Sequence, residues 1–416
     1  MSMKINVKSE FFYSFMVFCL IFFSDSTLMF GTNNKLAYIM IGKGCVFIIT
    51  FLLFCDYCKN NNGDRDIIVP IILISCLLID VILLNDVRGG YAVKIMLLLS
   101  AYYIIKKVGF ASFITYFINI IFWLSIISII TFVLNCLFIG CFKYLPEVYN
   151  TSNVRFYSGG LFNIIGFDSL HYMRNYSIFR EPGVFGVYVT IAVLYELILK
   201  KKISILKIII FVIALLSTLS VTIFLSTIVI FVIYLIIGAK KINKKIYFTS
   251  LFFVFVMMFF LIVLNKMNIF SSINLHEKII SMNTRITSTI VNIKIWLTSP
   301  VFGVGVGNYL QKYLSSVGQL KTDGCITSTI FINFAMHGFL YGVLMMIAIF
   351  AIFKNSSKNY IINYLACLIL LFLFICQYLI YDFMYNMLSM YGLIKLFNII
   401  KHRRKRGFEY ENIVVV

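Results

Sequence analysis

The sequence predicts an all-α protein: one integral membrane domain over residues 1–416, built as a polytopic bundle of about 12 transmembrane helices. Composition is the first indication, because 61% of the 416 residues are hydrophobic and only 12% are charged. A soluble domain is about half apolar and about a quarter charged. The mean hydropathy of +0.97 agrees. Continuous apolar stretches recur along the chain, which excludes a transmembrane β-barrel, whose strands alternate polar and apolar residues.

The predicted spans follow one another along the whole chain, mostly with short connections. They cover residues 11–30, 37–55, 67–84, 92–105, 113–135, 183–199, 204–218, 221–238, 246–264, 330–353, 360–380 and 387–400. Each is justified by a run of apolar residues near the length that a helix needs to cross the hydrocarbon core.

The net charge of +20 reflects where lysine and arginine fall. If the N-terminus is cytoplasmic, the inside loops hold more than half of the 36 basic residues, whereas the short outside loops hold only Lys35 and Arg88. This bias predicts that both termini are cytoplasmic. The basic tail "KHRRKR" then contacts anionic lipid headgroups, and we expect no nucleic-acid partner.

Two long connections, 140–182 and 265–329, are both predicted to lie outside. Long loops in compact proteins tend to be functional. These two carry most of the outside basic residues, although the positive-inside rule disfavours basic residues there and weakens for long loops. Their arginines are Arg155, Arg174, Arg180 and Arg285. The clustering indicates a negatively charged ligand at the outer surface.

The stretch "RNYSIFREPGVFGVY" begins at Arg174 and enters an apolar span. In the simpler interpretation it is a plain helix start: Pro182 and Gly183 mark the boundary, Glu181 suits the helix dipole and Arg180 reaches the lipid headgroups. In the functional interpretation Arg174 and Arg180 offer forked donors for phosphate oxygens. Glu181 would then be a general base.

The stretch "TRITSTIVNIKIWLTSPVFGVGVGNY" predicts a helix that starts at Asn283 or Thr284 and stops before Pro300. Its apolar stripe suits a helix on the membrane surface or packed under the loop. Gly303 and Gly305 permit a tight turn or a close approach of the backbone to a ligand. The glycine spacing is not that of a dinucleotide site.

Together with "HGFLYGVL" from His337, these two stretches resemble the O-antigen polymerase and ligase superfamily. Its members are membrane enzymes that join lipid-linked sugar chains outside the plasma membrane. The shared pattern is an arginine followed by a Glu-Pro-(Gly/Asn) block, then an arginine-bearing helix ending in Pro-x-x-Gly-x-Gly, then a glycine-bearing span. The topology of the whole chain agrees with it.

The resemblance implies a GT-C-like glycosyltransferase of the bacterial plasma (inner) membrane. Undecaprenyl diphosphate-linked oligosaccharide would be donor and acceptor, and the product a surface polysaccharide such as O-antigen of lipopolysaccharide, capsule or exopolysaccharide. A flippase and a chain-length regulator are the expected protein partners. No cofactor and no metal are expected, since the outside loops contain no Asp-x-Asp pair.

Carried over by position, Arg174 or Arg180 and Arg285 would bind the diphosphate, and Arg155 would supply a further cation. Fixed cations there act on the transition state, because negative charge grows on the leaving diphosphate. Glu181 is the expected base for the acceptor hydroxyl, with Asp323 as its rival.

One departure favours polymerase over ligase. Ligases of the superfamily carry a histidine eleven residues before a Gly-x-x-(Gly/Thr/Tyr) motif, and counting back from Gly338 places Thr327 there. His337 is out of register and is interpreted as a span residue, while His171 and His276 are alternative histidines in the loops.

A second departure lies in the short outside turn "STLSVTIFLS", where polymerase relatives carry an arginine after the serine and this chain has Val221. Outside the motifs, Asp25, Asp80 and Glu196 lie in or near spans, where ionisable groups are functional candidates.

Three other functions stay open: an O-antigen-type ligase, a lipid-linked oligosaccharide flippase or other transporter, and a structural membrane subunit. Transporters typically show repeats and broken helices near the membrane midplane, and the sequence suggests neither.

Overall fold

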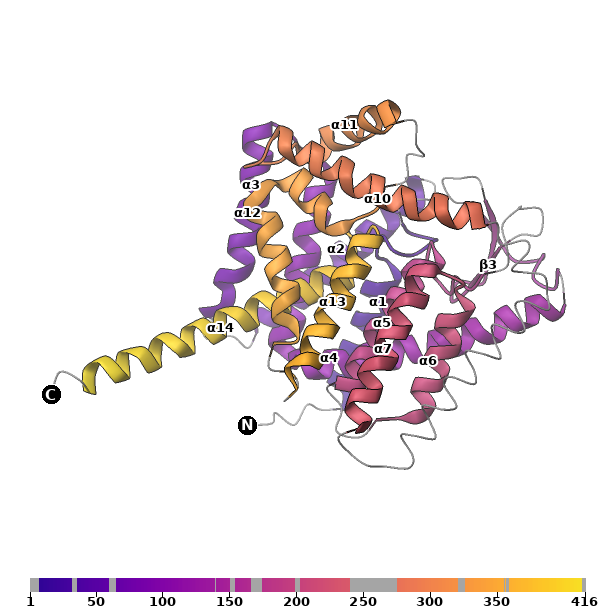
Figure 1. The fold of residues 1–416 in the computed structure, drawn as a ribbon, viewed down its shortest axis with the longest axis horizontal. Coiled ribbons are helices and arrows are strands. Elements are labelled where there is room, and N and C mark those ends of the chain that lie inside the picture. Colours follow the sequence, from indigo (N-terminus) through magenta and orange to yellow (C-terminus); the bar gives the residue numbers. More distant parts are fainter. Residues whose placement is uncertain are drawn as a thin grey trace.

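A computed structural model describes residues 7–31, 36–59, 65–138, 140–149, 154–165, 174–198, 203–239, 275–320, 326–354, 356 and 359–413 (Figure 1). The described chain is mostly helical, as predicted. Its helices are α1 (Val7–Phe22), α2 (Leu36–Cys58), α3 (Ile68–Leu84), α4 (Gly89–Leu137), α5 (Pro182–Ile198), α6 (Ile205–Ser217), α7 (Val221–Ala239), α10 (Leu275–Thr298), α11 (Gly305–Leu320), α12 (Thr329–Ile352), α13 (Tyr360–Cys376) and α14 (Phe383–Ile413). A short 3-10 helix covers Arg65–Ile67.

The apolar helices form one bundle. Helices α2, α4 and α12 are long and apolar enough to cross a membrane, and α3, α5, α6 and α13 are shorter apolar helices. Helix α4 packs against α2, α6 and α14, while α12 packs against α10, α13 and α14. In Figure 1, α10 and α11 lie together along the top of the bundle. The number of spans stays a prediction, and the predicted span 246–264 lies outside the described residues.

The predicted cytoplasmic loop at 106–112 coincides with a break between two helices that together make up α4, and its side of the membrane stays a prediction. The two spans predicted on either side of it are the halves of α4, and helical structure continues between them except at Gly109, whose φ is 77°. Glycine adopts this left-handed conformation at little cost. The lysines that suggested a loop are paired instead: Lys106 Nζ lies 2.6 Å from Asp66 Oδ2 and Lys107 Nζ lies 3.6 Å from Asp56 Oδ2.

The first long loop contains a small antiparallel sheet that the all-α prediction missed. Its strands are β1 (Glu147–Tyr149), β2 (Arg155–Ser158) and β3 (Asn163–Ile165), in the order β1-β2-β3. Phe156 on β2 and Ile165 on β3 are paired and buried with Leu28 and Tyr176. The loop is therefore anchored to the segment that follows α1.

The second long loop is mainly two helices. Helix α10 begins at Leu275, earlier than the predicted start at Asn283 or Thr284, and ends at Thr298, before Pro300. Helix α11 was not predicted. Tyr309 and Tyr313 on one face of α11 are buried.

Gly303 and Gly338 pack against each other where the turn after α10 meets α12. Both have left-handed φ values, 68° and 72°, and α12 is kinked at Gly338. Phe339 N donates to Pro300 O at 2.8 Å, and Val304 N donates to Ala335 O at 2.9 Å. The turn that contains Gly303 and the span that contains Gly338, which are separate motifs in the sequence, therefore pack against each other.

Gly305 and Gly307 approach a carboxylate that the sequence analysis did not consider. Gly307 N donates to Asp86 Oδ2 at 2.7 Å. A Cβ atom at Gly305 would lie 2.8 Å from the same carboxylate. Because Asp86 follows α3, these glycines fix the start of α11 to the bundle.

An ionisable cluster lies buried between α3, α4 and α12. His337 Nδ1 lies 2.9 Å from Asp80 Oδ2. Lys94, with 0% exposure, donates to Asn333 Oδ1 at 2.6 Å and lies 4.6 Å from the centre of the Tyr341 ring. Asp80 and Lys94 lie within electrostatic reach of each other, although their direct contacts are with His337 and Asn333.

Asp80→Ala is expected to lower the free energy of unfolding by about 1–3 kcal/mol, because it leaves the buried His337 ring without its hydrogen-bond partner and removes the attraction on Lys94. The double variant Asp80→Ala/Lys94→Met should lose less than the sum of the losses of Asp80→Ala and Lys94→Met alone, because the attraction between the two residues is lost only once. Thermal unfolding of the purified variants in detergent measures the loss of stability of each variant. A double variant whose loss equals the sum of the two single losses would show that the charges are not coupled.

Candidate functional site

Arg174, Arg180 and Arg285, here called the arginine cluster, contact two short segments of the chain. The first is the turn between α6 and α7. Arg174 Nε donates to Thr218 O at 3.1 Å and its Nη2 donates to Leu219 O at 2.8 Å. The backbone of this turn therefore orients the Arg174 guanidinium.

Arg285, on α10, reaches the same turn from the other side. Its Nη1 donates to Thr222 Oγ1 at the start of α7 and to Cys376 O at 3.2 Å. Arg174 and Arg285 are both partly exposed. Burial lowers the pKa of Arg174, and the Arg285 charge lowers it further, against the opposite effects of Tyr176 and Glu181. Two like charges held within electrostatic reach favour an anion beside them.

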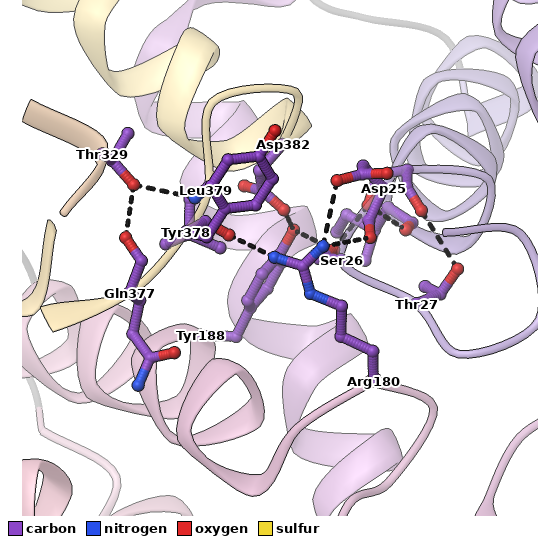
Figure 2. A network of polar contacts seen from close by, with 12 residues as sticks. Asp25, Ser26, Thr27, Arg180, Tyr188, Thr329, Gln377, Tyr378, Leu379 and Asp382 are labelled. Carbon is purple, nitrogen blue, oxygen red and sulfur yellow. Dashed lines mark hydrogen bonds and ion pairs between the residues drawn. The ribbon is translucent and has the colours of Figure 1, made fainter. Parts of the chain in front are cut away.

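Arg180 is placed differently. Only 4% of it is exposed, and its Nη1 lies 3.0 Å from Asp25 Oδ2 (Figure 2). Its Nη2 donates to Tyr378 O. Burial acts to lower the pKa of Arg180, but nearby carboxylates, Asp25 first, raise it above the usual value. The charged side chain of Arg180 therefore holds the segment after α1 and the segment before α14 together.

The second segment, between α13 and α14, is held from both sides. Thr329 Oγ1 donates to Gln377 O at 2.5 Å and accepts from Leu379 N at 2.7 Å. Beside it, Tyr188 OH donates to Asp382 Oδ2 at 2.5 Å (Figure 2). Arg180 donates to the carbonyl of Tyr378 in this segment, and Arg285 donates to the carbonyl of Cys376 at the end of α13. The α13–α14 segment therefore connects the two arginines.

Glu181 lies beside the cluster and is exposed. Its charge acts on both Arg174 and Arg180, while its carboxylate has no hydrogen bond to a described residue. Helix α5 begins directly after it, at the buried Pro182. A Cβ atom at Gly183 would lie 2.4 Å from Gln377 Nε2, so glycine allows the α13–α14 segment to approach α5 closely.

The remaining candidates are not joined to the cluster by a described contact. Arg155 on β2 pairs with Glu147, with 3.1 Å between Nη1 and Oε1. Pro300, Gly303 and Gly305 form the turn that docks on α12 and Asp86. Asp323 and His171 lie outside the described residues, as does the side chain of His276.

Thr327, at the position of the ligase histidine, packs against α10. Its backbone N–H donates to Ser288 Oγ at 2.9 Å, and its carbonyl accepts from Asn292 Nδ2 at 3.3 Å. These contacts place Thr327 against the same helix that carries Arg285.

Sequence reasoning missed the partners of Arg180. Tyr378 and Asp382 lie at and just beyond the end of an apolar run, and nothing in their spacing marks them. Asp25 was noted as an ionisable residue near a span, but its pairing with Arg180 joins residues 155 positions apart.

Fold and site together define a helical membrane protein with a cationic site between its helix ends. Among known families, the model of the O-antigen ligase family matches residues 206–329. This confirms the resemblance to the O-antigen polymerase and ligase superfamily. The matched segment includes α6, α7, Arg285 and the turn at Pro300, but not Arg174 or Arg180. No curated protein matches the chain.

Proposed function

We propose that the protein is a repeat-unit polymerase that acts in polysaccharide assembly. It would transfer a growing chain from one undecaprenyl diphosphate to a second lipid-linked unit at the outer face of the bacterial plasma membrane, with both termini in the cytoplasm. The observation that carries this proposal is the pairing of Arg174 and Arg285 across the α6–α7 turn. Two partly exposed guanidiniums within electrostatic reach of each other suit a diphosphate.

The reaction needs a base and a site for the leaving group. Glu181 would take the proton of the acceptor hydroxyl, whose oxygen bonds to the anomeric carbon of the donor sugar. The bond from that carbon to the diphosphate oxygen breaks, and its electron pair stays on the diphosphate. Arg174 and Arg285 would stabilise this charge. The carboxylate of Glu181 is exposed and forms no hydrogen bond with a described residue, which supports its role as the base.

Arg180 has a positioning role in this proposal. Because it is buried and paired with Asp25, it supports the site by fixing the α13–α14 segment, on which Arg285 also depends. Of the two arginines before α5, Arg174 is therefore the better candidate for a diphosphate ligand.

A ligase is the second candidate, because the matching family model is described as O-antigen ligase. Such an enzyme would bind the same lipid diphosphate but transfer the finished glycan to another acceptor. The threonine at position 327, in place of the ligase histidine, favours the polymerase.

A replacement assay separates these functions. The gene is deleted and wild-type, Glu181→Gln, Arg174→Ala or Arg285→Ala protein is supplied, and the surface glycan is run on a gel. A polymerase defect leaves single repeat units on the final acceptor, a ligase defect leaves none attached, and a flippase defect retains the units inside. Wild-type ladders from all three variants would refute the proposed site.

A further inference from the structure

A small polar cavity lies beside Arg174, on the side facing the sheet and α4. Its volume is about 10 Å³, which is room for about one water-sized group. The polar residues that line it are Ser128, Thr131, Asn135, Asn163, Arg174 and Asn175. Arg174 thus belongs both to the arginine cluster and to this cavity.

Two amides on the cavity wall have unused hydrogen-bonding atoms. Asn163, 5% exposed, has no described hydrogen-bond partner for either Nδ2 or Oδ1, and Asn135, 4% exposed, has none for Oδ1. Asn175 differs, since its Nδ2 donates to Ser128 Oγ at 3.1 Å and Ser217 Oγ at 2.9 Å. Buried polar groups are nearly always paired, so a donor and an acceptor left open on Asn163 indicate a bound group.

The lining chemistry restricts what that group can be. Among the described residues, the polar lining besides Arg174 consists of neutral amides and hydroxyls, with no carboxylate. An amide that offers one donor and one acceptor matches a sugar hydroxyl, which is both donor and acceptor. The cavity is too small for a whole sugar ring, so only one substituent of the ring would enter it.

We infer that this cavity binds one hydroxyl group of the sugar attached directly to the lipid diphosphate. The inference rests on the proposed function, because a diphosphate at Arg174 places its attached sugar beside Asn163 and Asn135. The cavity then sets specificity: a sugar without the matching group leaves the Asn163 amide unpaired, which lowers affinity by about tenfold to a hundredfold.

The test measures binding to the full-length protein in lipid nanodiscs with three probes: farnesyl diphosphate, farnesyl diphosphoglucose and farnesyl diphospho-N-acetylglucosamine. The wild type should bind at least one sugar-bearing probe about tenfold more tightly than farnesyl diphosphate. Asn163→Ala should remove this difference while leaving the affinity for farnesyl diphosphate within about twofold. The glucose and N-acetylglucosamine arms distinguish the 2-hydroxyl, which the acetamido group replaces, from the other hydroxyls of the ring.

The matched control is Asn119→Ala, an asparagine of α4 that is exposed and absent from the cavity lining; it should keep the wild-type difference. Asn163→Ser and Asn135→Ala serve if Asn163→Ala does not fold. If the wild type binds farnesyl diphosphate and the variants keep the full difference, the cavity holds an ordered water only and the inference alone is wrong. If the wild type binds none of the probes, the proposed function is wrong as well.

Discussion

Replacing Arg174 or Arg285 by alanine is expected to lower the rate of polymer formation by about 10²–10³-fold, the usual effect of removing a donor that stabilises developing charge. The two guanidiniums hold opposite ends of one turn, Arg174 at Thr218 and Leu219 and Arg285 at Thr222. Because they would act on one diphosphate as a unit, the double variant should lose less than the product of the two single losses.

The rate is measured with purified protein and lipid-linked repeat units in vesicles. Arg174→Lys and Arg285→Lys keep the charge but lose the planar fork, so they should recover only part of the activity. Arg155→Ala is the control, because Arg155 pairs with Glu147 on the sheet. The assignment would be contradicted by single alanine variants that have the same unfolding temperature as the wild type and still polymerise at near wild-type rates.

Gly338→Ala is expected to prevent stable folding. A Cβ atom at this position would lie 2.0 Å from Val301 O, and its φ of 72° is strained for any residue with a side chain. The left-handed conformation alone costs about 1–2 kcal/mol, and the backbone overlap forces the turn after Pro300 away from α12. We expect a total loss above about 4 kcal/mol, the upper end for single substitutions.

The control is Gly44→Ala in α2, where a Cβ atom meets nothing within 4 Å. That substitution should leave stability unchanged or raise it by up to about 1 kcal/mol, because alanine favours a helix. The yield and the unfolding temperature in detergent are measured for both variants. A Gly338→Ala protein as stable as the Gly44→Ala protein would show that the close contact between the turn and α12 does not exist.

The sequence predicted helices best where apolar runs are continuous. The predicted span 183–199 corresponds to α5 (Pro182–Ile198), and 330–353 corresponds to α12 (Thr329–Ile352). The predicted connection 106–112 is reduced to a break at Gly109 with helix on both sides, where Lys106 and Lys107 pair with Asp66 and Asp56. The sequence did not predict β1 to β3, whose strands are only three or four residues long.

The site was only partly predictable. Arg174, Arg180 and Arg285 could be selected as candidates because basic residues cluster in the loops predicted to lie outside. This clustering can be recognised from positions along the chain alone. The different surroundings of these arginines could not be predicted: the contact of Arg180 with Tyr378 spans 198 positions. Such pairing depends on how the segments before α5 and before α14 lie against each other, which no local pattern encodes.

The most direct test of the central claim, that Arg174 and Arg285 hold the departing lipid diphosphate, is the affinity of the purified protein for undecaprenyl diphosphate. Each lost hydrogen bond between charged groups is worth about 1.5–3 kcal/mol. The double variant Arg174→Ala/Arg285→Ala should therefore bind this product at least about 100-fold more weakly than the wild type, while Arg155→Ala should bind it equally well. Equal affinity of the double variant and the wild type would contradict the claim.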